Sequence, residues 1–301
     1  MNRQKSIIAL LIIVNIFLIS AFVFVLTGGL KSDGEITEVA DEMYNELPVE
    51  TDVSERTEQT EHVVTIKEFL KKAMEPVGET MYVYGGGWNK EDTGAGEYAV
   101  TIGVAEEWRR FYEEQDSSYN SSEHRYEITK GLDCSGYLGW TIYNTLETEN
   151  GKSGYVFFAE EYADKMSGLG FGEKTNRGSF SDYFPGDIMS SKSDSHVWIS
   201  LGQCSDGSVV LVNSSPPGVR ICGTATPDGN ARSEAVEIAE EYMSAVFPDW
   251  YARYPECLKN TAYLTNYDRF RWYTDGRGVM TDPEGYLSLT PKEILSYIFY
   301  G

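Results

Sequence analysis

Near its N-terminus the sequence contains a run of 20 residues, Ile7 to Leu26, without a charged side chain. A helix of this length is about 30 Å long, which matches the hydrocarbon thickness of a membrane. Arg3 and Lys5 precede the run, and beyond Lys31 the chain becomes acidic. The positive-inside rule therefore predicts a single-pass helix with a cytoplasmic N-terminus and an extracytoplasmic remainder.

A cleaved signal peptide is the alternative interpretation of this N-terminus. The apolar run is longer than the roughly 7–15 apolar residues of a typical signal peptide. No clean small-x-small cleavage site follows it. These observations favour an uncleaved signal-anchor, with residues 1–32 as cytoplasmic tip and membrane helix. The cell membrane is then a direct partner of the chain through residues 7–26.

Residues 33–61 carry eleven acidic side chains against one basic residue, Arg56, and one aromatic residue, Tyr44. Such a segment has too little apolar surface to offset its ordering entropy, so we expect a disordered acidic stalk. The formal charge of -22 divides into +3 for residues 1–32, -10 for the stalk and -15 for the remainder. This acidity gives no bulk attraction to nucleic-acid phosphates, and we expect no nucleic-acid partner.

Residues 62–301 have a length that suits one domain with elaborations. Apolar spacing and capping signals predict helices over 62–74, 134–146, 233–243 and 290–297. Turn sequences separate three strand-like runs at 196–201, 208–212 and 219–221. Helices followed by an antiparallel meander predict an α+β fold.

Cys134 has a setting that the other three cysteines lack. Asp133 is a candidate N-cap of the helix 134–146, so Cys134 lies in the first turn. The positive end of the helix dipole favours a thiolate there, and the small neighbours Ser135 and Gly136 leave the sulfur accessible. The competing interpretation is a buried cysteine that acts as a small apolar side chain.

His196 and Asn213 are the candidate partners of this thiol. His196 opens the first strand of the meander, and Asn213 ends the neighbouring strand. Antiparallel pairing places the two nearly level with each other. A histidine can take the proton of a thiol and return it, while a third polar group fixes the ring's tautomer. The pattern predicts a Cys134–His196–Asn213 triad, against the alternative that His196 is structural.

Motifs for metal and nucleotide cofactors do not occur in the sequence. There is no C-x-x-C pair, no H-E-x-x-H motif, no P-loop and no complete dinucleotide fingerprint. We therefore expect neither a metal nor an organic cofactor.

Four segments, in this order along the chain, resemble motifs of the NlpC-type papain-like cell-wall peptidase family. They are residues 82–86 (YVYGG), 131–137 (GLDCSGY), 184–188 (FPGDI) and 196–202 (HVWISLG). The resemblance covers residues 64–225. It implies a papain-like domain in which an N-terminal helix bearing the nucleophile packs on an antiparallel β-meander, here preceded by one transmembrane helix.

The resemblance also implies an activity. Members of the family hydrolyse peptide bonds in the stem peptides of bacterial peptidoglycan, most often between D-γ-glutamyl and diamino-acid residues. It implies Cys134 as nucleophile, His196 as base and acid, and Asn213 as the third member. The substrate-binding positions it implies are Tyr82, Asp133 and Ser135, of which the first two hold the free amine of a terminal L-alanine.

The chain departs from the family pattern in several places. Asn213 replaces the usual histidine, Tyr84 replaces the usual tryptophan, and about 88–131 is an insertion that would wall the cleft. A C-terminal extension, about 226–301, lies outside the resemblance. Two other functions remain open: an N-acetylmuramoyl-L-alanine amidase, and a non-catalytic wall-binding or assembly protein.

Overall fold

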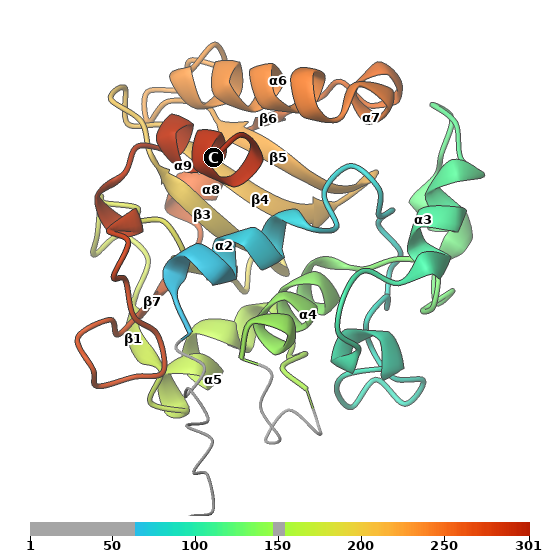
Figure 1. Ribbon diagram of the computed structural model, residues 1–301, viewed down its shortest axis with the longest axis horizontal. Coiled ribbons are helices and arrows are strands. Elements are labelled where there is room, and N and C mark those ends of the chain that lie inside the picture. The colour runs from blue at the N-terminus through green and yellow to red at the C-terminus, as the bar shows by residue number, and fades with distance from the viewer. Residues whose placement is uncertain (1–63, 147–153) are drawn as a thin grey trace, which may run out of the picture. The chain divides into compact units, whose positions relative to one another are not determined.

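The computed structural model describes residues 64–146 and 154–301 (Figure 1). These residues belong to one compact unit, Glu61–Gly301. The predicted membrane helix at 7–26 and the predicted stalk at 33–61 lie outside the described residues. Within the described part, no helix is both long enough and apolar enough to cross a membrane.

Most of the predicted helices form, and capping residues begin two of them. Thr65 and Thr290 each accept a hydrogen bond from a glutamate three residues on, whose side chain bonds back, which is a capping box. The described α-helices are α2 (Ile66–Met74), α3 (Glu106–Glu113), α4 (Cys134–Leu146), α5 (Tyr162–Gly168), α6 (Glu234–Val246), α7 (Pro248–Arg253), α8 (Ala262–Thr265) and α9 (Pro291–Phe299). Short 3-10 helices occupy η1 (Glu97–Val100), η2 (Ser121–His124), η4 (Ala159–Glu161) and η5 (Tyr286–Ser288).

The strands of the described residues form one seven-stranded sheet in the order β1-β7-β2-β3-β4-β5-β6. All neighbours are antiparallel except β5 and β6, which are parallel. The strands are β1 (Gly172–Thr175), β2 (Ile188–Ser191), β3 (His196–Gln203), β4 (Val209–Ser215), β5 (Gly218–Thr224), β6 (Leu258–Lys259) and β7 (Asp268–Trp272). The predicted meander is therefore the β3-β4-β5 centre of a larger sheet.

The two faces of the sheet carry different cores, because successive side chains of a strand point to opposite faces. Ile199 and Val212 are paired across β3 and β4 and pack in the cluster that includes α2, α4 and α6. Trp198 and Leu211 pack on the other face with Tyr267. Figure 1 shows α6 lying along β5, and α4 contacts β3 and β4. The helix that begins with Cys134 thus lies against the central strands.

The predicted fold class, an α+β papain-like fold in which a helix packs on an antiparallel meander, is wrong for the described residues, and the transmembrane helix predicted to precede it lies outside them. They form a mixed α/β structure with a seven-stranded sheet. Two strands, β6 and β7, come from the C-terminal extension. The strand β7 includes Arg269 and Arg271, which are neutralised by Asp182 and Asp187. The two partners of each ion pair lie far apart in the sequence, so no local sequence pattern predicts them.

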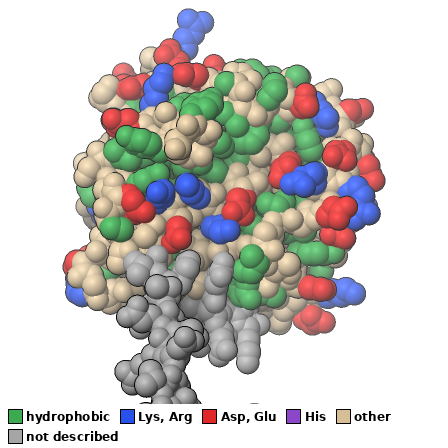
Figure 2. All heavy atoms as spheres, viewed as in Figure 1, with side chains coloured by type: hydrophobic (Ala, Val, Ile, Leu, Met, Phe, Trp, Pro, Cys, Tyr) green, Lys and Arg blue, Asp and Glu red, His purple; other side chains and the backbone are tan. Residues whose placement is uncertain are grey.

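The surface of the described unit is of mixed charge. On the face shown in Figure 2, acidic and basic side chains are interspersed, with hydrophobic areas between them. The acidity of the sequence is therefore not gathered into one continuous patch on this face.

Candidate active site

Cys134 is the first residue of α4, and Asp133 caps the helix. The Asp133 carboxylate accepts hydrogen bonds from the backbone N–H of Gly136 at 2.7 Å and from the Ser135 hydroxyl at 2.8 Å. Its second oxygen accepts from the backbone N–H of Gly85 at 3.1 Å. One buried carboxylate therefore fixes both the start of α4 and the glycine turn before it.

The glycine turn and the helix approach each other more closely than other residues would allow. A Cβ at Gly136 would lie 1.9 Å from the carbonyl oxygen of Gly86, and one at Gly86 would lie 2.3 Å from the carbonyl oxygen of Gly131. Both positions therefore need glycine. The sequence motifs 82–86 and 131–137 are thus two sides of one tightly packed structure.

A cavity of about 280 Å³ opens beside Cys134. It brings together Tyr82, Asp133, Cys134 and Ser135, the predicted nucleophile and all three predicted substrate-binding residues. The remaining lining residues are Tyr84, Gly85, Trp88, Asp92, Phe158, Ala159, Glu160 and Ser195. Three of the lining side chains are carboxylates and none is a lysine or arginine, so the cavity suits a cationic group.

The insertion at 88–131 forms part of the wall of this cavity. Tyr119 donates a hydrogen bond to the carbonyl oxygen of Tyr82 at 2.6 Å. Tyr126 packs edge-to-face on Tyr84 with 5.3 Å between ring centroids, and the Arg125 guanidinium lies 4.0 Å from the Tyr84 centroid. Sequence reasoning named the insertion as a wall without finding these residues, because no local motif marks them.

The lining of the cavity includes two aromatic residues that sequence reasoning missed, Trp88 at the start of the insertion and Phe158. Trp88 and Phe158 face each other with 5.1 Å between ring centroids, and Phe158 is 53% exposed. Trp88 also donates its indole N–H to the Ser135 hydroxyl at 3.0 Å. These contacts join the loop near residue 158 to the glycine turn. The two segments are far apart in the sequence, so hydrophobic periodicity does not predict their contact.

His196 begins β3, and its neighbours in the chain contact the nucleophile. The sulfur of Cys134 lies 4.0 Å from the carbonyl oxygen of Ser195. A hydrogen bond from the backbone N–H of Val197 favours the thiolate of Cys134. The structure thus brings Cys134 against both residues that flank His196.

Asn213 lies on β4 and interacts with His196. Ile199 pairs with Val212, so continuing this register places Asn213 two residues from the level of His196, on the same face. The Asn213 side chain favours the charged form of His196 and so opposes part of the lowering of its pKa by burial. No hydrogen bond of ordinary geometry joins the two side chains, because His196 Nε2 and Asn213 Oδ1 are both buried without a hydrogen-bond partner. Asn213 also donates to the sulfur of Cys222 at 3.6 Å.

Burial keeps the thiol and the imidazole neutral at pH 7. It raises the pKa of Cys134 to about 12, with a smaller contribution from the charge of Asp133. It lowers the pKa of His196 to about 3, helped by the charges of Lys259 and Arg220. The expectation of a resting thiolate at the helix terminus is therefore wrong for this state, because desolvation exceeds the effect of the dipole.

The other cysteines and the metal-binding residue types form no second centre. All four cysteines lie in the described part of the chain, and all are free and buried. No group of three His, Cys, Asp or Glu side chains within residues 64–146 and 154–301 is placed to hold a metal ion.

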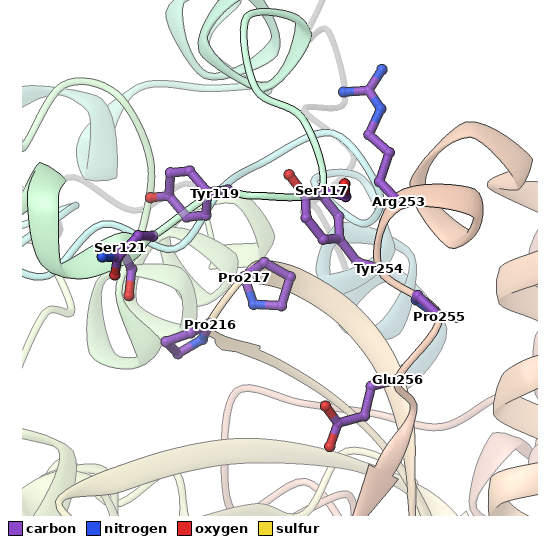
Figure 3. Close-up of a pocket in the computed structure, with 10 residues that line it drawn as sticks. Ser117, Tyr119, Ser121, Pro216, Pro217, Arg253, Tyr254, Pro255 and Glu256 are labelled. Atoms are coloured by element: carbon purple, nitrogen blue, oxygen red, sulfur yellow. The ribbon is translucent and has the colours of Figure 1, made fainter.

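Figure 3 shows a second cavity, of about 470 Å³, which Tyr82 does not line. Tyr119 and Pro217 line it. The Tyr119 hydroxyl donates a hydrogen bond to the carbonyl oxygen of Tyr82, and the backbone N–H of Tyr82 donates one to the carbonyl oxygen of Pro217. Its remaining lining residues are Ser117, Asn120, Ser121, Pro216, Arg253, Tyr254, Pro255 and Glu256. Cys134 lines the smaller cavity and not this one, so the smaller cavity is the candidate active site, although His196 and Asn213 line neither of the two.

Comparison of this chain with protein-family models, with curated proteins and with solved structures finds no match.

Proposed function

We propose that this protein is a membrane-anchored, extracytoplasmic cysteine peptidase that hydrolyses stem peptides of bacterial peptidoglycan. The target bond is of the D-γ-glutamyl–diamino-acid type, as the motif resemblance implies. One observation carries the proposal: Cys134 opens a helix inside a cavity with Tyr82, Asp133 and Ser135. The chain on either side of His196 lies against its sulfur. The uncharged run 7–26 supports the membrane location.

The acidic cavity supports a substrate with a free amine. Asp92, Asp133 and Glu160 line it without a basic side chain among the lining residues. Burial raises the pKa of Asp133 to about 6, so this carboxylate is largely ionised at pH 7. The free N-terminus of a stem peptide would supply a matching positive charge.

The reaction begins with proton transfer from the Cys134 thiol to the neutral ring of His196. The sulfur then attacks the peptide carbonyl, and the ring gives its proton to the departing amine, which leaves an acyl-enzyme. Water next gives a proton to the ring and attacks the acyl carbon, which returns the sulfur to its thiol form. The backbone N–H of Cys134 has no intrahelical acceptor and is available to stabilise the oxyanion.

Asn213 acts on the ring of His196 in this scheme. Its side chain raises the pKa of the ring and so offsets part of the effect of burial. It therefore favours the imidazolium that forms after the thiol has lost its proton. A His196–Asn213 hydrogen bond formed in the substrate complex would strengthen this effect.

The test is digestion of purified muropeptides by the full chain in detergent micelles. We expect new amino groups to appear, and Cys134→Ala to lower the rate at least about 1000-fold with an unchanged circular dichroism spectrum. An undiminished rate in Cys134→Ala would exclude Cys134 as nucleophile. Mass spectrometry of the products identifies the bond, because an amidase would release intact stem peptides from the glycan.

A non-catalytic wall-binding role is the second candidate, and the neutral, high-pKa thiol favours it. It predicts that muropeptides bind the native chain and Cys134→Ala with equal affinity while no product forms. Measuring both affinity and product from the same samples separates the two functions.

A further inference from the structure

Lys259 is a largely buried amine that the proposed chemistry does not use. It ends β6, in the C-terminal extension, and donates a hydrogen bond to the Ser215 hydroxyl at 2.9 Å. Its Nζ also lies 5.4 Å from the ring centroid of Tyr263. No ion pair joins it to a carboxylate within the described residues, and burial lowers its pKa. A largely buried ammonium has three N–H donors, and here only one of them has a hydrogen-bond partner. This arrangement lowers the stability of the fold unless a ligand accepts the remaining hydrogen bonds.

Arg220 adds a second positive charge without a carboxylate partner in the part of the chain described. Its guanidinium is buried and donates only to backbone carbonyl groups, those of Ser215, Pro216, Gly218 and Glu256. Arg220 and Lys259 are close enough for the charge of Arg220 to lower the pKa of the lysine. The charge of Glu256 acts on Lys259 and partly offsets it, but neither cation has an ion-pair partner within the described residues. In a chain of charge -22, this indicates a place that attracts an anion.

This positive region adjoins the candidate catalytic residues. The ring centroid of Tyr263 lies 5.7 Å from that of His196. Ser215 follows Asn213 by two residues on β4, so the two share a face of the sheet. His196, Ser215, Lys259 and Tyr263 are each partly exposed, which leaves a path for a small ligand.

The candidate site therefore combines two regions of opposite charge. Carboxylates line the cavity that contains Cys134, and the charges of Lys259 and Arg220 act on His196. Ser215, which accepts the hydrogen bond from Lys259, is followed in the chain by Pro216. Pro216 lines the cavity shown in Figure 3, so that cavity adjoins the end of β4.

We propose that Lys259 binds a carboxylate on the leaving-group side of the substrate, so that the enzyme selects short peptides with a free amine at one end and a free carboxylate at the other. This inference rests on the proposed function. The Ser215 hydroxyl, which accepts from Lys259, is free to donate its own proton to the same carboxylate. A charge-assisted pair of this kind, largely shielded from water, is stronger than a neutral hydrogen bond.

The test measures binding of two probes, L-alanyl-γ-D-glutamyl-L-lysine and its C-terminal carboxamide, to the full chain carrying Cys134→Ala. We expect the free acid to bind about 10-fold to 100-fold more tightly than the amide. Adding Lys259→Met should bring this ratio below about threefold, since methionine preserves volume without charge. Lys292→Met, at an exposed lysine paired with Glu241, is the matched control and should leave the ratio unchanged.

Three results would overturn the inference. The free acid and the amide could bind Cys134→Ala equally well, the preference for the free acid could persist in Lys259→Met, or neither probe could bind at millimolar concentration. Circular dichroism and thermal melting of the Lys259→Met chain establish that it is folded. Digestion of muropeptides by the native chain keeps the two proposals separate. If muropeptides are cleaved but the free acid and the amide bind equally well, only the proposed carboxylate site is excluded. If the affinity ratio depends on Lys259 but no muropeptide is cleaved, only the proposed hydrolysis is excluded.

Discussion

Asp133 gives the sharpest quantitative prediction, because its pKa connects the candidate active site to the stability of the fold. Burial raises this pKa from 3.8 to about 6, in spite of the hydrogen bonds from Gly136, Ser135 and Gly85 that favour the charged form. Between these two pH values the folded state binds more protons than the unfolded state, so the free energy of unfolding falls as pH rises. A difference of about 2 pKa units corresponds to about 3 kcal/mol.

The perturbation is Asp133→Asn, which keeps the shape of the side chain and removes its titration. Urea unfolding of the native chain and the variant at pH 4, 5, 6 and 7 gives the stability difference between them. Other titrating groups are common to both chains and cancel in this difference. We expect the native chain to lose about 2.4 kcal/mol relative to the variant between pH 4 and pH 7, which is less than the full difference because the unfolded carboxyl is already partly ionised at pH 4. A difference that stays constant to within about 0.5 kcal/mol would refute the assignment of a destabilised carboxylate at this position.

Two further substitutions test the packing that positions the site. Gly136→Ala introduces a Cβ that would lie 1.9 Å from a backbone oxygen of the glycine turn, so thermal melting should show a loss of several kcal/mol, whereas Gly168→Ala has open space and should change little. Arg271→Ala leaves the buried Asp187 carboxylate without its ion pair, and urea unfolding should show a loss of about 3–5 kcal/mol. The control Arg277→Ala, at an exposed pair, should cost less than about 1 kcal/mol, and equal losses in both variants would contradict this account.

The features predicted well from the sequence are those determined by neighbouring residues. The helices α2 and α9 form close to the predicted ranges, each with a capping box, and α4 begins at Cys134 after the predicted cap. Turn chemistry also places β3, β4 and β5 correctly to within a few residues. In each case the decisive hydrogen bonds join residues only a few positions apart, so the sequence displays them directly.

The features that were missed depend on partners distant in the chain. The strand β7 pairs with β2 and β1, about 80 and 95 residues earlier, and its two arginines are neutralised by aspartates of the intervening loop. The cavity-lining residues Trp88 and Phe158 meet only through tertiary packing. Lys259 reaches the region of His196 because β6 pairs with β5 at the edge of the sheet. Propensity and periodicity contain no information on such contacts.

The protonation state of Cys134 shows how a correct local argument can be outweighed. A helix N-terminus stabilises a negative charge by about 0.3–1 kcal/mol, and by about 2 kcal/mol in favourable geometries. The rise in the pKa of the buried thiol, from 9.0 to about 12, corresponds to about 4 kcal/mol in the opposite direction. Desolvation therefore exceeds the dipole, and the resting pair is neutral thiol and neutral imidazole. In the proposed reaction the charge separates only when the substrate is bound, and the helix N-terminus then acts on the oxyanion instead of on a standing thiolate.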